Sequence, residues 1–131
     1  MATFRFDLVS PEKLLFAGEV DQVDVPGAEG DFGVLAQHAP LVTALRPGIL
    51  TVYREAGPLR VVVNGGFAEV NPAGLTVLAD MAVPIEEFDR ASLAAEINDT
   101  EEDVADAADG ATRDKASEKL DQLKALEAAL S

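Results

Sequence analysis

The sequence predicts a mainly β protein with an α appendage: an N-terminal β-sandwich followed by a C-terminal α-helical hairpin. Residues 1–85 contain 33 large apolar or tyrosine side chains, whereas residues 86–131 contain eight, together with eleven alanines. In the first part these side chains form short runs separated by Gly, Pro and Asn, a pattern typical of sandwiches and barrels. We therefore expect a β-sandwich domain over residues 1–84 and a helix-turn-helix appendage over residues 85–131.

The strands are predicted from side chains that alternate with a period of two. Phe4, Phe6 and Leu8 alternate with Arg5 and Asp7, which indicates a strand with one buried face. Similar patterns predict strands around 23–25 and over 49–54, 59–64, 67–70 and 75–79, with hairpin turns at 55–58 and 71–74. The three consecutive valines at 61–63 are typical of a strand covered on both faces. The glycine pair at 65–66 predicts a bulge or a close approach of two backbones.

The first helix of the appendage is predicted from apolar side chains at helical spacing: Leu93, Ile97, Val104 and Ala108. These four residues share one helix only if it runs through Thr100. The alternative is an interruption of the helix at 98–100, because Asn, Asp and Thr favour helix caps over helix interiors.

A second helix is predicted after the Asp-Gly step at 109–110, with Thr112 as its N-cap. Its apolar stripe consists of Ala116, Leu120, Leu123 and Leu130, with Leu126 beside it. The appendage has few large apolar side chains, so their burial releases little free energy to offset the conformational entropy lost when the appendage becomes ordered. We therefore expect the hairpin to depend on docking, and the sandwich to fold without it.

The composition argues against several classes of function. A net charge of −14 disfavours binding to nucleic acid or anionic lipid. The chain has no cysteine and a single histidine, which excludes disulfides and a zinc site built from several His or Cys ligands. No apolar run approaches the roughly 18–20 residues that span a bilayer, and the first residues lack a signal-peptide core. We expect a soluble cytoplasmic protein that meets a membrane only through a partner.

Residues 23–48 read VDVPGAEGDFGVLAQHAPLVTALRPG. The stretch contains five pieces at a spacing that few folds would need. They are, in order, a valine strand, P-G-x-E-G, a short apolar segment, H-A-P-L and R-P-G. The stretch closely resembles the ε subunits of bacterial F-type ATP synthases, which are called δ in mitochondria. Residues 65–70 (GGFAEV) and 75–80 (LTVLAD) resemble the same family, and the resemblance covers residues 3–83.

The resemblance implies a non-catalytic subunit of the central stalk in a proton-translocating ATP synthase. In that role the sandwich would bind the γ subunit through apolar strand faces and rest on the ring of c subunits. The C-terminal helices would reach the α and β subunits. The protein would be peripheral, held by its partners at the cytoplasmic face of the inner membrane.

Two carboxylates and the histidine are the candidate site residues. Gly30 and Gly33 bracket a predicted acidic turn carrying Glu29 and Asp31, whose side chains would share one side of an extended segment. From the residues alone these are a polar surface loop, an acid/base pair or weak calcium ligands. His38 is a structural corner or a pH-sensitive contact. The resemblance implies that all three lie on the c-ring side, where we expect the acidic loop to matter for attachment rather than stability.

Two other functions are compatible with the sequence: a small sandwich that binds a ligand or peptide and dimerises through its hairpin, and a hydrolase that uses Glu29, Asp31 and His38. No catalytic residue, cofactor or metal is predicted. In some ε subunits a segment I/L-D-x-x-R-A binds ATP. Residues 88–91 read F-D-R-A without the two-residue spacer, so we expect no nucleotide site. Residues 86–131 carry 14 acidic and five basic side chains, which predicts a weak regulator of ATP hydrolysis.

Overall fold

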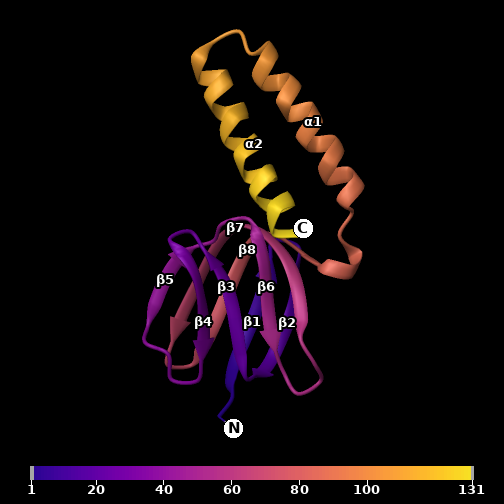
Figure 1. The fold of residues 1–131 in the computed structure, drawn as a ribbon. Helices are drawn as coiled ribbons and strands as arrows, with labels where there is room; N and C mark the ends of the chain where they lie inside the picture. Colours follow the sequence, from indigo (N-terminus) through magenta and orange to yellow (C-terminus); the bar gives the residue numbers. More distant parts are fainter. Residues whose placement is uncertain (1, 131) are drawn as a thin grey trace. The chain divides into compact units, whose positions relative to one another are not determined.

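The computed structural model describes residues 2–130 and gives that part of the chain eight β-strands followed by two α-helices (Figure 1). The strands are β1 (Phe4–Ser10), β2 (Lys13–Val20), β3 (Gln22–Gly27), β4 (Gly30–Leu35), β5 (Leu41–Ala44), β6 (Gly48–Tyr53), β7 (Leu59–Asn71) and β8 (Gly74–Pro84). A short 3-10 helix, η1 (Ile85–Glu87), precedes α1 (Arg90–Asp106) and α2 (Gly110–Leu130). The predicted fold class is confirmed: the strands come first and the helices last.

In the described residues the strands form one continuous eight-stranded sheet, which β7 divides into the two layers of the sandwich. Along one edge β7 pairs with β8 over almost its whole length. Along its other edge, residues 59–63 pair with β6 and residues 67–70 pair with β5. The β7–β8 hairpin therefore belongs to both layers of the sandwich. In one layer, called sheet A here, the turn end of the hairpin pairs with β5 on one side and with β1, followed by β2, on the other. In the other layer, called sheet B, the open end of the hairpin pairs with β6, which is followed by β3 and β4.

Two glycines allow β7 to pass from one sheet to the other. Gly65 and Gly66 have φ angles of 71° and 100°, a left-handed region that favours glycine. A Cβ on Gly66 would lie 2.0 Å from the carbonyl oxygen of Leu78. The pairing register with β8 is the same on both sides of the glycines, which identifies a close backbone approach rather than a bulge. The prediction of two separate strands here was wrong, because the bent backbone stays paired throughout.

The bend also decides which side chains enter the core. Before the glycines the core side chains of β7 are the odd-numbered Val61 and Val63, and after them the even-numbered Ala68 and Val70. Neighbouring residues of a strand point to opposite faces, so this change of parity keeps both halves directed at one core. Each of the three valines at 61–63 is buried, as predicted. Among the fully buried side chains of this core are Phe6, Leu8, Val23, Leu50, Val52 and Val77.

Three strands were not predicted: β2, β4 and β5. Strand β2 lacks a clean alternation because its register on β1 shifts between Leu8 and Val9, which leaves Leu15 as the extra residue of a bulge. Leu15 and its neighbour Phe16 both pack against the core. Strand β4 contains two glycines and was interpreted as a turn. Strand β5 is only four residues long, and three of its residues are exposed.

The contacts divide the chain into two compact units, of which the first ends at Glu87 and the second begins at Phe88. In the second unit, α1 runs without a break through Thr100. The Thr100 side chain is buried, and its hydroxyl donates a hydrogen bond of 2.8 Å to the carbonyl oxygen of Glu96. The predicted alternative of an interrupted helix was therefore wrong, because the hydroxyl finds its partner inside the helix. Ala108 lies beyond the end of α1.

Aspartates cap both helices. Asp89 accepts a hydrogen bond from the backbone N–H of Ser92 at 3.0 Å, and Asp109 accepts one from Thr112 at 2.7 Å. Thr112, predicted as the cap of the second helix, is thus the residue being capped. The buried side chains of α2 are Leu123, Leu126 and Leu130, and Lys119 forms an ion pair with Glu96 of α1 at 3.4 Å. Within the described residues, no helix is long and apolar enough to cross a bilayer.

We predict that a chain ending after Glu87 folds without the helices. The core of the sandwich is formed by residues of the first unit alone. This shortened chain should give a β-type circular dichroism spectrum and a single cooperative melt, with the full-length chain as the reference. A broad, non-cooperative transition would contradict the prediction.

The helix caps make the second unit sensitive to acid. Hydrogen bonds to the charged carboxylates of Asp89 and Asp109 lower the pKa of both from the ordinary value of 3.8. Their stabilisation is therefore complete above that value and is lost as the pH falls through the lower pKa of the folded state. We expect the melting temperature of the helical signal to be lower for the double variant Asp89→Asn, Asp109→Asn than for wild type at pH 6. The difference should narrow between about pH 5 and about pH 2.

A second variant separates charge from hydrogen bonding in this experiment. Asn retains a capping oxygen without a charge, whereas Asp109→Ala removes the cap altogether and should lower helix stability at every pH. The measurement is circular dichroism at the helical band across the pH series. A constant gap between wild type and the Asn variant at all pH values would disprove the assignment of acid sensitivity to these caps.

Candidate partner-contact site

The acidic turn between β3 and β4 is narrower than predicted. Gly27 and Gly30 are the last paired residues of the two strands, so the turn itself consists of Ala28 and Glu29. Asp31 lies within β4, opposite Pro26. Gly30 has φ 141°, which breaks the extended backbone between the two acids. The expectation that Glu29 and Asp31 share one side through strand alternation was therefore based on the wrong local structure.

Asp31 has a partner that the sequence does not predict. The guanidinium Nη2 of Arg46 forms an ion pair and hydrogen bond with Asp31 Oδ1. Both side chains are largely exposed, at 42% for Arg46 and 64% for Asp31. The one available signal was the R-P-G step that closes residues 23–48, because it supplies the lone cation of that stretch. The two residues are 15 positions apart in the sequence, so no local pattern predicts that they meet.

Backbone contacts hold this turn against the connection between β5 and β6. The N–H of Ala28 donates to the carbonyl of Ala44 at 2.9 Å, and the N–H of Arg46 donates to the carbonyl of Pro26 at 3.0 Å. Gly27 forms an isolated bridge with Leu45. A Cβ on Gly27 would lie 2.6 Å from the carbonyl oxygen of Gly30. The turn is therefore held by a second segment of the chain, with Glu29 exposed at its tip.

His38 lies apart from the acidic turn. It follows the opposite end of β4, in a turn closed by its N–H donating to the carbonyl of Leu35 at 3.2 Å. Its imidazole ring is 6.3 Å from the ring of Phe32. Phe32 and Asp31 are neighbours in a strand and point to opposite faces, so the imidazole and the Asp31 carboxylate lie on different faces of β4. The structure does not bring the three predicted residues into one cluster.

The hydrogen bond of the His38 imidazole determines which of its ring nitrogens carries a hydrogen toward the backbone. Its Nδ1 lies 2.6 Å from the backbone carbonyl of Ala39, an arrangement in which Nδ1–H is the donor. The orienting group is a carbonyl rather than a carboxylate, unlike the base of a hydrolytic triad. The geometry therefore gives no support to a hydrolase built on Glu29, Asp31 and His38.

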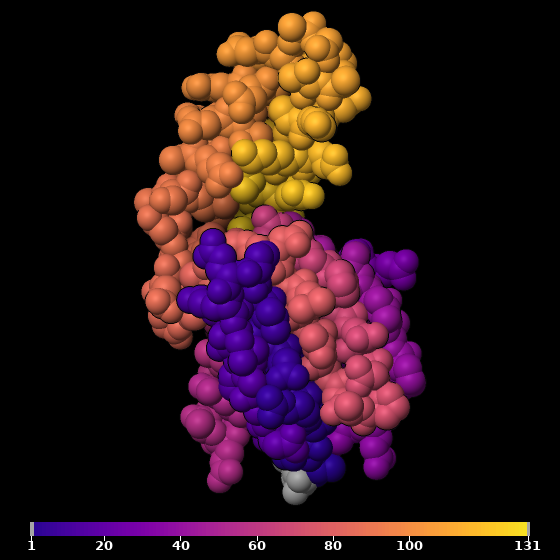
Figure 2. Space-filling model, turned by 180° about the vertical axis from the view of Figure 1, so that it is seen from behind, coloured from indigo at the N-terminus to yellow at the C-terminus, as the bar shows by residue number. Residues whose placement is uncertain are grey.

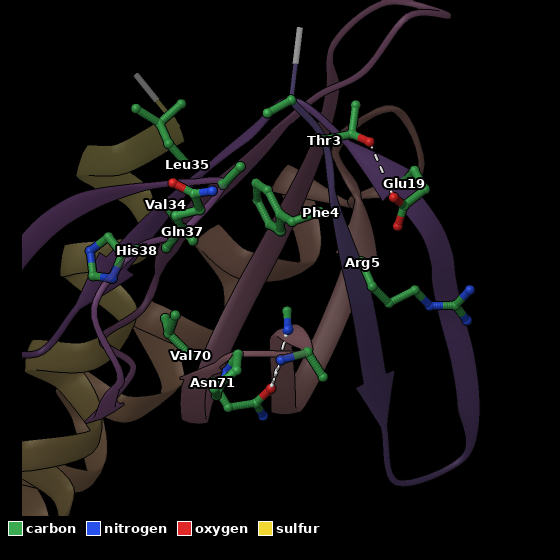
Figure 3. Close-up of a pocket in the computed structure, with 15 residues that line it drawn as sticks. Thr3, Phe4, Arg5, Glu19, Val34, Leu35, Gln37, His38, Val70 and Asn71 are labelled. Atoms are coloured by element: carbon green, nitrogen blue, oxygen red, sulfur yellow. Dashed lines mark hydrogen bonds between the residues drawn. The ribbon is translucent and has the colours of Figure 1, made fainter.

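A cavity of about 350 Å³ opens beside His38, at the end of the sandwich near the start of β1 (Figure 3). Phe4, Val34 and Val70 give it an apolar lining. Its polar groups are engaged at the rim: the Thr3 hydroxyl donates to Glu19 at 3.1 Å, and the Asn71 Oδ1 accepts from Ala73 and Gly74. The backbone of Gln37 at the mouth has φ 66°, which is uncommon outside glycine. The lining of the cavity is therefore mixed, with apolar side chains and with polar groups that already have partners within the chain.

An apolar row crosses the outer face of sheet A. The pairing register places Ala44, Phe67, Leu78, Val9 and Leu14 side by side on the neighbouring strands β5, β7, β8, β1 and β2. Figure 2 shows these strands on one face, from the indigo β1 and β2 through the salmon β8 to the purple β5. Phe67, Leu78 and Leu14 are 47%, 40% and 60% exposed. Val42 of β5, which is 64% exposed, extends the row. Exposed apolar side chains that adjoin in this way mark an interaction surface.

The outer face of sheet B is polar where β3 and β6 pair. Asp24 accepts hydrogen bonds from Gln22 Nε2 at 2.7 Å and from the Tyr53 hydroxyl at 3.0 Å. The hydrogen bond to Asp24, together with the negative charge of Asp24, raises the pKa of the Tyr53 hydroxyl. Tyr53 is thereby held in its neutral, donating form. The two faces of the sandwich thus differ in chemistry, and sheet A carries the apolar row.

Comparisons with known proteins match this chain along its whole length. A family model described as "ATP synthase, Delta/Epsilon chain, beta-sandwich domain" matches residues 3–85. The chain is 57% identical to ATP synthase epsilon chain 1 of Nitrobacter hamburgensis over 131 residues, which cover 100% of this chain and 96% of the relative. It is 56% identical to the ATP synthase epsilon chain of Parvibaculum lavamentivorans over 123 residues, which cover 93% of each chain.

Two solved structures contain chains of similar fold. One is the cryo-EM structure of Euglena gracilis mitochondrial ATP synthase, OSCP/F1/c-ring in rotational state 1; its matching chain gives a TM-score of 0.84 at 33% identity and covers 100% of this chain and 83% of that one. The other is the central stalk/c-ring of Tetrahymena thermophila mitochondrial ATP synthase, with a TM-score of 0.65, 14% identity and coverage of 98% and 96%. At that identity the second likeness shows the fold alone.

Proposed function

The chain belongs to the family of ATP synthase delta/epsilon chains, and from this premise we propose that it is a non-catalytic subunit of the central stalk of an F-type ATP synthase. In this role it joins the γ subunit to the c-ring and couples rotation of the ring to the catalytic head. The protein is peripheral, held by its partners at the cytoplasmic face of the inner membrane. The Euglena gracilis relative comes from an assembly that its description calls OSCP/F1/c-ring.

The observation that carries this proposal is the apolar row on sheet A. Five neighbouring strands present apolar side chains outward in one register, and Phe67, Leu78 and Leu14 are between 40% and 60% exposed. Leaving such a surface in water is costly, at roughly 25 cal/mol per Å² of apolar area. A permanent partner removes that cost. We assign γ to this face and the c-ring to the β3–β4 turn, with Glu29 in the turn and Asp31 beside it in β4.

A matched pair of variants tests the assignment of γ. Leu78→Asp places a charge in the centre of the row, whereas Leu35→Asp makes the same change at a similarly exposed leucine of β4, outside the row. Loss of one buried leucine costs about 1.5–3 kcal/mol, or about tenfold or more in affinity. With each chain as bait in a pull-down from detergent-treated membranes, wild type and Leu35→Asp should recover γ with α and β. Leu78→Asp should recover at least about tenfold less.

The control is the melting temperature, which both substitutions at exposed positions should leave within a few degrees of wild type. If wild type recovers no α, β or γ subunit under mild detergent, the stalk function itself is wrong. If both variants bind equally well, the stalk function stands but γ sits elsewhere.

We also propose that the helical hairpin is at most a weak brake on ATP hydrolysis. Residues 86–131 carry 14 acidic and five basic side chains, and Lys119, one of the few bases, is already paired with Glu96. A strongly acidic hairpin is repelled by acidic partner surfaces, and such repulsion lowers affinity. Asp89, which stands where some family members have their ATP motif, serves here as the N-cap of α1.

The test compares ATP hydrolysis by the assembled complex with the full-length chain and with a chain ending after Glu87. We expect a rise of less than about twofold on truncation, because little inhibitory binding is lost. Equal amounts of chain in the two complexes, measured on gels, are the control. A rise of tenfold or more would show the hairpin to be a strong brake and the charge argument to be wrong.

A further inference from the structure

Three strands of sheet A meet at Gly66, in the bend of β7. The N–H of Leu45, directly after β5, donates to the carbonyl of Gly66 at 2.9 Å. On its other side Gly66 pairs with Ala79 of β8. A Cβ on Gly66 would overlap the carbonyl oxygen of Leu78 and would lie 2.8 Å from the Cα of Ala79. The backbones of β7 and β8 are therefore as close here as a residue without a side chain allows.

The same three strands supply the centre of the apolar row. In the pairing register Phe67 has Ala44 on one side and Leu78 on the other. Phe67 directly follows Gly66 in the chain, and Ala44 directly precedes the residue that donates to Gly66. Leu78 itself carries the carbonyl oxygen that leaves no room for a Cβ on Gly66. Any displacement of the backbone at this point therefore moves the three side chains relative to one another.

We propose that Gly66 is a positioning residue of the γ-binding surface: because it carries no side chain, β5, β7 and β8 approach closely enough to align Phe67 with Leu78 in one row. This inference rests on the proposed function, in which γ binds the apolar row. It adds that the row depends on a close approach of backbones as well as on its apolar side chains. Partners bind tightly where their surfaces are complementary in shape. A displaced row therefore loses affinity for γ even though each of its side chains is still present.

Two other glycines of the chain provide matched controls for a substitution at Gly66. Gly57, Gly66 and Gly74 have φ angles of 112°, 100° and 144°, so an alanine is strained at each of them. A Cβ on Gly57 would meet no atom within 4 Å beyond its chain neighbours, so Gly57→Ala introduces the strain alone. A Cβ on Gly74 would overlap the backbone carbonyl oxygen of Arg5 in β1. Gly74→Ala therefore combines the same strain with the same kind of backbone overlap, four residues along β8 from Leu78 and outside the row.

The experiment uses the full-length chain as bait for γ in a pull-down, in the cold, from detergent-treated membranes depleted of the chain. Recovered γ is normalised to the folded bait, which circular dichroism measures. We expect Gly66→Ala to recover at least about fivefold less γ than wild type, because its row no longer fits a partner surface of fixed shape. Gly74→Ala should lower the melting temperature to a similar degree and still recover γ to within about twofold of wild type. Gly57→Ala should lower the melting temperature less and recover γ as wild type does.

The outcomes separate this inference from the stalk function. Wild-type chain that recovers no γ contradicts the stalk function and, with it, the inference. If wild type recovers γ and the Gly66→Ala and Gly74→Ala variants recover equal amounts, Gly66 contributes to stability only, which overturns the inference and leaves the stalk function standing. A Gly66→Ala chain with no folded fraction also overturns it, because Gly66 would then serve folding alone. Loss of γ by Gly66→Ala, together with its retention by Gly74→Ala, supports the positioning role.

Discussion

The close approach of backbones at Gly65–Gly66 is the constraint on which the rest of the sandwich depends. At this point β7 lies so near β8 that a Cβ on Gly66 would meet the Leu78 carbonyl oxygen at 2.0 Å. The bend lets one long hairpin serve both layers, which reduces the number of separate strands the chain needs. The bend also changes which residues of β7 face inward, from odd-numbered before it to even-numbered after it. Val63 and Ala68 therefore both reach the same core.

The same bend determines which side chains of β7 and β8 point outward. Once Ala68 and Val70 are directed inward, Phe67 must point outward, and the register with β8 places Leu78 beside it. The apolar row on sheet A is thus a consequence of where the parity changes. The outer face and the core are set by one local feature of the backbone, since moving the bend by one residue would exchange the two faces.

The parts of this structure that the sequence predicted are those governed by local rules. The alternation around Phe6, the turn at 71–74 and the existence of both helices each rest on interactions within a few residues. The strand β2 was missed because the bulge at Leu15 disrupts the period of two, and β4 because its glycines resemble a turn. In each case the strand is defined by its pairing with the preceding strand of a hairpin, which overrides the local pattern.

In the candidate site, too, local sequence predicts the residue types but not the groups that these residues contact. Glu29, Asp31 and His38 were identified by type and spacing, but their partners are set by the fold: Arg46 for Asp31, and Phe32 with the Ala39 carbonyl for His38. The net charge of the chain does not predict the charges at a single turn. A chain with a net charge of −14 still pairs Asp31, beside the turn, with Arg46, one of its ten Lys and Arg residues. What a partner meets is the local arrangement of charges, because salt screens exposed charges beyond about 10 Å.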